Sequence, residues 1–78
     1  MNWQDYIEER PDVMNGKPVF KGTRVTLRTV LASLAEGATD EEILSDFPTL
    51  TAQDLRAAVA FAAASAQEDI PASPLPRL

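Results

Sequence analysis

The chain contains no cysteine and no histidine among its 78 residues. The missing cysteine excludes disulfides, thiol chemistry and zinc sites with sulfur ligands. The missing histidine excludes imidazole ligands and a serine–histidine catalytic dyad. On composition alone, only a magnesium site built from carboxylates stays open as a metal site.

Long apolar runs are missing as well. No segment approaches the roughly 20 apolar residues that a membrane-spanning helix needs. The start, MNWQDYIEERPD, has neither the basic nor the apolar region of a signal peptide. The sequence therefore predicts a soluble cytoplasmic protein with no membrane role. A chain of 78 residues forms one domain at most, and a core this small often gains stability from a partner or a second copy.

Positive charge is scarce and unevenly placed. The chain has 7 basic and 12 acidic residues, which give a net charge of −5. Residues 10–28 nevertheless carry five basic side chains and one acidic one, whereas residues 29–78 carry eight acidic and two basic ones. The chain is thus electrically divided, and its basic part coincides with the turn-rich stretch MNGKPVFKGTRVTL, residues 14–27.

Residues 1–26 predict short strands and turns. DYIEE is expected to form a first strand with Ile7 facing inward. Asn15-Gly16, between DVM and PVF, predicts a tight hairpin because both residues tolerate a positive φ. Lys21-Gly22-Thr23 predicts a second reversal, in which Gly22 adopts a φ that side chains resist.

The apolar pattern changes to a helical period at residue 26. Helices are predicted at about 27–36, 40–47 and 52–67, because apolar residues recur at helical spacing and a threonine precedes each helix as N-cap. The expected fold is mainly α: a three-helix helix-turn-helix unit with a small N-terminal β-hairpin, forming a single domain over residues 1–67. Residues 68–78 form a proline-rich tail that cannot continue the third helix.

Basic residues of the turn-rich stretch are candidates for holding a phosphate. The first helix begins at Thr26, and a helix N-terminus favours an anion. The residues expected to contact DNA there are Lys17, Lys21, Thr23, Arg24 and Arg28. The alternative is a hairpin with solvated lysines and an arginine paired with Glu8 or Asp12, and the sequence does not choose between the two. The spacing of a nucleotide-binding P-loop is absent.

The start of the third helix is a candidate for base reading. In a helix-turn-helix protein the N-terminal residues of this helix enter the major groove. Gln53 can pair with adenine and Arg56 with guanine. Asp54 and the lack of lysine oppose strong phosphate attraction, so a purely structural role for this helix is the alternative.

Residues 57–64 of the third helix, AAVAFAAA, contain no polar side chain. One face is expected to pack on the core, and it comprises Leu55, Ala58, Val59, Ala62, Ala63 and Ala66. A surface helix normally has a polar face. The opposite face is therefore predicted to contact a second copy or another protein, through Ala57, Ala60, Phe61 and Ala64. The alternative is that alanine is simply a good helix former.

No catalytic group can be assembled from these residues. The serines and threonines have no histidine partner, and the cluster of Asp40, Glu41 and Glu42 suits the positive end of a helix dipole without a metal. The sequence therefore predicts a protein that is not an enzyme and that has no metal and no cofactor.

The motifs together resemble the bacterial and archaeal family known as domain of unknown function 433. The resemblance covers roughly residues 3–66, and Trp3 and Tyr6 also suit it. It rests on Gly16-Lys17-Pro18, Gly22-Thr23-Arg24, Gly37, Glu41-Glu42, Phe47-Pro48-Thr49-Leu50 and Asp54.

This family is similar to VapB-like antitoxins of type II toxin–antitoxin pairs. The resemblance implies a homeodomain-like helix-turn-helix, a PIN-like ribonuclease toxin as partner, and repression of the chain's own operon. We expect a homodimer that binds the toxin and operator DNA. The tail is expected to fold onto the toxin through Ile70, Leu75 and Leu78, with plain disorder as the alternative. A protein–protein interaction module without DNA binding is the alternative function.

Overall fold

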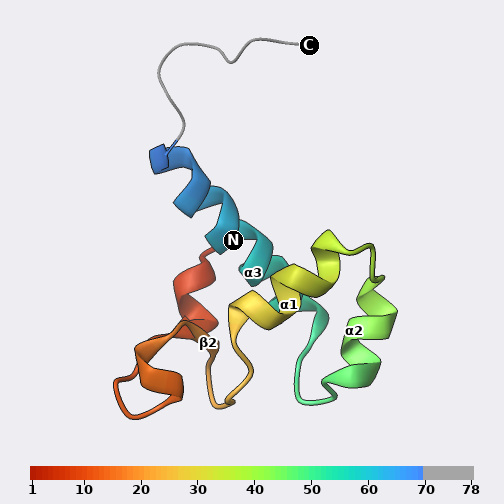
Figure 1. The fold of residues 1–78 in the computed structure, drawn as a ribbon, viewed down its shortest axis with the longest axis horizontal. Helices are drawn as coiled ribbons and strands as arrows, with labels where there is room; N and C mark the ends of the chain where they lie inside the picture. The colour runs from red at the N-terminus through yellow and green to blue at the C-terminus, as the bar shows by residue number, and fades with distance from the viewer. Residues whose placement is uncertain (70–78) are drawn as a thin grey trace, which may run out of the picture.

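In the part of the chain that the structure describes, three α-helices follow a small two-stranded sheet (Figure 1). The structure is a computed structural model that describes residues 1–69, with side chains described for residues 1–66. The predicted fold class is confirmed. The elements are η1 (Trp3–Asp5), β1 (Ile7–Glu8), η2 (Met14–Gly16), β2 (Val19–Phe20), α1 (Leu27–Ala35), α2 (Asp40–Asp46) and α3 (Ala52–Asp69).

Local capping sets the limits of α1. The Thr26 hydroxyl accepts a hydrogen bond from the Thr29 backbone N–H at 3.3 Å, which satisfies one free donor of the first turn. At the other end Gly37 has a φ of 96°. The N–H groups of Gly37 and Ala38 donate back to the carbonyls of Leu34 and Ser33. This is a Schellman arrangement, and it confirms the predicted role of Gly37 as the residue that ends the helix.

The other two helices also begin as predicted. In α2 the Thr39 hydroxyl accepts from the Glu42 N–H at 3.1 Å, and the Glu42 carboxylate accepts from the Thr39 N–H at 2.8 Å. This reciprocal pair is a capping box. Thr51 and Asp54 repeat it at the start of α3. The Thr51 hydroxyl accepts from the Asp54 N–H at 3.2 Å, and the Asp54 carboxylate accepts from the Thr51 N–H at 2.9 Å. The third helix reaches Asp69, slightly beyond the predicted end at residue 67.

The sheet differs from the predicted tight hairpin. Ile7 pairs with Phe20 and Glu8 with Val19, so the predicted first strand is confirmed in shortened form. Asn15 lies instead in the η2 turn within the connection between the strands, and the DVM strand does not form. A tight hairpin at Asn15-Gly16 would place Pro18 in its ladder, and proline has no N–H to donate. Pairing Ile7 with Phe20 also buries both side chains.

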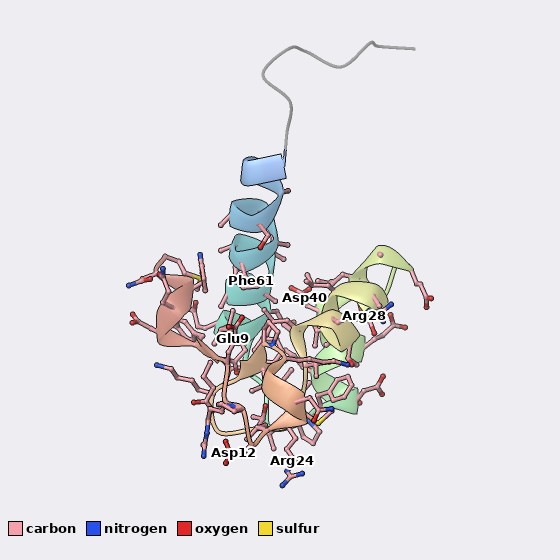
Figure 2. All side chains as sticks on the ribbon, turned by 60° about the vertical axis from the view of Figure 1, so that its left-hand side comes forward. Glu9, Asp12, Arg24, Arg28, Asp40 and Phe61 are labelled. Carbon is pink, nitrogen blue, oxygen red and sulfur yellow. The ribbon has the colours of Figure 1, made fainter. Side chains whose placement is uncertain are left out.

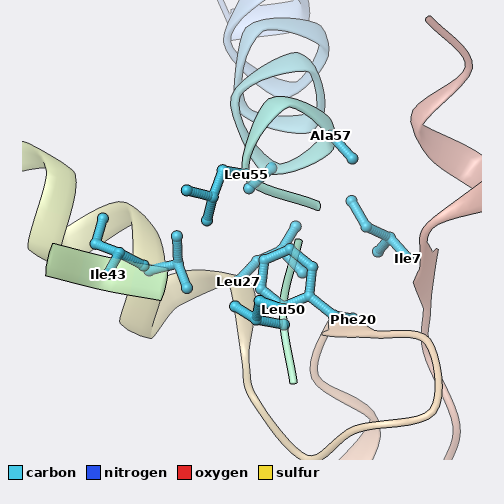
Figure 3. Close-up of a cluster of buried hydrophobic side chains, with 9 residues drawn as sticks. Ile7, Phe20, Leu27, Ile43, Leu50, Leu55 and Ala57 are labelled. Atoms are coloured by element: carbon cyan, nitrogen blue, oxygen red, sulfur yellow. The ribbon is translucent and has the colours of Figure 1, made fainter. Parts of the chain in front are cut away.

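The core lies where the sheet meets the three helices (Figure 3). The sheet contributes Ile7 and Phe20, and the first two turns of α3 contribute three side chains. Burial of these apolar side chains is the main favourable term in folding. The buried cluster comprises Ile7, Phe20, Leu27, Val30, Ile43, Leu50, Leu55, Ala57 and Ala58.

The buried face of α3 is rotated from the predicted one. Leu55 and Ala58 are buried as predicted, but Val59 is 52% exposed and Ala57 is fully buried. The prediction was therefore wrong for Val59, Ala63 and Ala66 as core residues, because all three are exposed. It was also wrong for Ala57 as a surface residue. The reason is that η1 as well as α1 packs on α3, so the helix is covered on a side that its alanine pattern could not identify.

We expect Ile43→Val to destabilise the domain by about 0.5–1.5 kcal/mol, because Ile43 is 1% exposed and the lost methyl leaves a small cavity. Urea unfolding followed by circular dichroism measures the free energy of unfolding. Ser45→Ala is the matched control, because Ser45 is an exposed residue of the same helix. Equal effects of the two substitutions would contradict the position of Ile43 in the core.

Candidate nucleic-acid and partner-binding surfaces

A tight turn joins β2 to α1 and carries the Gly-Thr-Arg motif. Gly22 has a φ of 76°, which confirms its predicted conformation. Its N–H donates to the Glu8 carboxylate at 3.2 Å. The Thr23 hydroxyl donates to the Phe20 carbonyl at 2.8 Å and accepts from the Val25 N–H at 3.0 Å. Thr23 was predicted to contact DNA, but its hydroxyl is engaged inside the turn.

The same turn presents two exposed cations. Lys21 and Arg24 are both exposed, and Figure 2 shows Arg24 pointing away from the lower end of the molecule. Among the side chains that the structure describes, the only ion pair joins the Arg10 guanidinium to the Asp12 carboxylate at 3.2 Å. Arg24 therefore pairs with neither Glu8 nor Asp12, which the sequence had left open as its partners. The turn holds an arginine whose guanidinium stays available for an external anion.

Lys17 and Arg28 meet at a different place, a groove of about 710 Å³ beside α1. We call this the α1 groove. Its apolar lining includes Met14, Leu31 and Phe61. The hydroxyl groups of Thr26 and Thr29 are hydrogen-bonded to each other at 2.8 Å. The α1 groove thus combines an apolar floor with two cations.

Met14 in the α1 groove was not identified from the sequence. It is 41% exposed, and its φ of 49° lies in the left-handed region. That conformation costs roughly 1–2 kcal/mol for a residue with a side chain. Asn15 follows with a φ of 58°, a value that asparagine tolerates better. The only sequence signal was the turn-forming Asn15-Gly16 pair, which gives no reason to expect strain at the residue before it.

Gln53 and Arg56 lie on α3, beside a second groove of about 550 Å³. We call this the α3 groove, and it also contains Asp40. The helix before it is acidic, because α2 has Asp40, Glu41 and Glu42 in its first turn and no basic residue in its last turn. The two predicted base-reading residues are therefore brought together, but next to negative charge and apart from the cations of the turn and the α1 groove.

The four residues predicted to contact a partner fall in different environments. Ala57 is buried, so it offers no surface. Phe61 is half-buried, and its ring meets that of Trp3 edge to face with centroids 5.0 Å apart. Ala60 and Ala64 are half-buried. The predicted face is therefore partly covered from within the same chain by η1.

Some predictions fall on segments with a limited description. The tail residues predicted to bind the toxin, Ile70, Leu75 and Leu78, lie outside the described residues. Within the described residues, no three or more acidic side chains are grouped so as to hold a metal ion. No helix in that part of the chain is long and apolar enough to cross a membrane.

Fold and surfaces together define a small, mainly helical domain with an N-terminal sheet and a basic turn. The chain belongs to the family described as "Protein of unknown function (DUF433)", whose model matches residues 7–62. This confirms the resemblance. The chain is similar to the uncharacterized protein y4eO of Sinorhizobium fredii, with 37% identity over 62 residues that cover 80% of this chain and 28% of that protein.

A solved structure shares the fold. The crystal structure of a DUF433 member protein from Anabaena variabilis superimposes with a TM-score of 0.75 at 34% identity, covering 83% of this chain and 64% of that one. The chain therefore spans less than two thirds of the length of either relative.

Replacing Thr23 with valine tests the structural role of its hydroxyl. Thr23→Val keeps the shape but removes two hydrogen bonds of the turn, and we expect a loss of about 1–2 kcal/mol in the free energy of unfolding. Thr23→Ser keeps the hydroxyl and is the matched control. If urea unfolding gives the same midpoint for all three chains, the turn does not depend on these bonds.

Proposed function

We propose that this chain is an antitoxin-like component of a type II toxin–antitoxin pair, which binds a toxin partner and operator DNA as a homodimer. The family resemblance suggests the class, and the exposed cations of the turn support the DNA role. A homodimer suits that role, because it presents two copies of the basic turn to a palindromic operator.

The observation that carries the DNA role is the position of Lys21 and Arg24. Both are exposed on a turn whose backbone is fixed by the Thr23 hydroxyl and the Glu8 carboxylate. Neither is in an ion pair with a described carboxylate. A fixed turn loses little conformational entropy when it meets a phosphate, and its cations release counterions from DNA.

The acidic α2 argues against the usual docking of a helix-turn-helix. In that geometry the helix before the recognition helix crosses the phosphate backbone. Here that helix carries Glu41, Glu42 and Asp46 on its exposed surface, which would repel the phosphates. We therefore assign the main phosphate contacts to the turn. That Gln53 and Arg56 read base edges stays a prediction.

A second candidate function is a protein-interaction module with no DNA role. The α1 groove favours it, because exposed Met14 and half-buried Phe61 line an apolar floor flanked by Lys17 and Arg28. Methionine is common on surfaces that accept varied partners. A toxin segment with apolar and acidic side chains would suit this groove, and in an antitoxin the two functions are compatible.

A salt series with the chain's own upstream DNA tests the DNA role. We expect saturable binding whose logarithmic affinity falls linearly with the logarithm of salt concentration. Lys21→Ala with Arg24→Ala should reduce that slope by about two for each bound protomer, because each lost phosphate contact removes roughly 0.9. Fluorescence anisotropy measures both quantities.

Arg10→Ala is the control for this experiment, because Arg10 is exposed but already paired with Asp12. It should leave the slope nearly unchanged. If no salt-dependent binding occurs, even with a co-purified partner present, the DNA role is wrong and the interaction module becomes the function.

A further inference from the structure

Exposed apolar side chains gather in the α3 groove. Of the described residues, three large apolar side chains are exposed: Met1 at 62%, Val59 at 52% and Met14 at 41%. Met1 and Val59 both line the α3 groove, and Leu34 and Leu55 extend its apolar lining. Exposed apolar surface that is concentrated in one hollow marks an interaction site more strongly than scattered residues do.

The shape of α3 suits a helical partner. Figure 1 shows that its C-terminal half extends beyond α1 and α2. Val59, Ala60 and Ala63 present mostly small side chains along the groove, and small side chains let two helices approach closely. A projecting helix gains little stability by itself, because most helical stability in proteins comes from packing an apolar face.

The charges in the α3 groove are self-complementary. Asp40 and Arg56 both line it, and neither forms an ion pair within the described part of the protomer. When two copies are related by a two-fold axis, the acidic residue in the α3 groove of one copy can pair with the basic residue in the α3 groove of the other. Across that axis, Arg56 would face the partner subunit's Asp40, and the reverse contact would form by symmetry.

We infer that two copies of this chain associate through their α3 grooves, with antiparallel α3 helices crossing near Val59. This inference rests on the dimeric part of the proposed function, and the interface it locates shares only Ala60 with the predicted one. Ala57 and Phe61 belong to the protomer's own packing, whereas Val59 and Ala63 meet the second copy. Arg56 then faces the partner, so this inference replaces its predicted role of reading a base edge and leaves DNA contact to Lys21 and Arg24.

The solution mass in the absence of DNA tests this inference separately from the DNA role. Light scattering after size exclusion should give a dimer for the wild-type chain at micromolar concentration. Val59→Lys should raise the dimer dissociation constant at least about tenfold, because it replaces a buried apolar contact with a charge in both copies. Circular dichroism checks that the variant stays folded.

Met14→Lys is the matched control, because Met14 is an exposed apolar residue outside the α3 groove. It should remain dimeric. A monomeric wild-type chain would overturn the inference. So would a Val59→Lys variant that associates as tightly as the wild type, or a dimer that Met14→Lys disrupts in its place.

Charge reversal tests the proposed contact between Arg56 and the partner subunit's Asp40. Arg56→Asp alone should weaken association, because two carboxylates then face each other across the axis. Adding Asp40→Arg should restore it, because the pair is re-formed with the charges exchanged. If the double variant associates no better than the single variant, this contact is wrong and the two-fold arrangement with it.

Discussion

The turn over residues 20–25 is the constraint on which both the fold and the basic surface depend. Its hydrogen bonds bring Val19 back beside Thr26 in an isolated bridge, so the second strand and the start of the first helix lie together. Phe20 and Leu27 are buried on either side of it. A single small reversal thus closes the core, fixes the cap of α1 and projects Arg24 into solvent.

This arrangement separates the molecule electrically. Five of the seven basic residues belong to the sheet connection, the turn and the start of α1. The first turn of α2 is instead wholly acidic except for its threonine cap. In a chain of net negative charge, local basic surface can still attract a polyanion over a Debye length of about 8 Å at physiological salt. The direction in which the turn faces therefore matters more for the proposed function than the overall charge does.

The sequence predicted the features that depend on neighbours in the chain. The helix limits followed from local spacing, which identifies the capping box of Thr39 with Glu42 and the helix-ending Gly37. The prediction from sequence failed for features that depend on contacts between residues far apart in the chain. Asn15-Gly16 resembles a hairpin, but the register was set by burying Ile7 against α3 and the sheet. An alanine-rich helix gives no periodic signal, so its buried face depended on where η1 packs.

The candidate surfaces also divide into features set by local sequence and features set by tertiary contacts. The turn at Gly22 that carries Arg24 was predicted. The sequence could not show that Arg24 has neither Glu8 nor Asp12 as a partner, because Glu8 instead accepts from the Gly22 N–H. Likewise, Lys17 and Arg28 line the same groove only because of the path that the connection takes around η2, and local spacing does not reveal that path. Spacing along the chain gives the residue types of a surface, whereas tertiary contacts decide which of them share it.

The proposed DNA role depends on a turn that is rigid before any partner binds. Native-state hydrogen exchange of the Thr23 and Val25 amides tests it most directly, since their N–H groups donate to the Phe20 carbonyl and the Thr23 hydroxyl. We expect both amides to exchange with an opening free energy close to that of Val30 in α1, as members of one cooperative unit. Exchange at the rate of an unfolded peptide at both amides would contradict it.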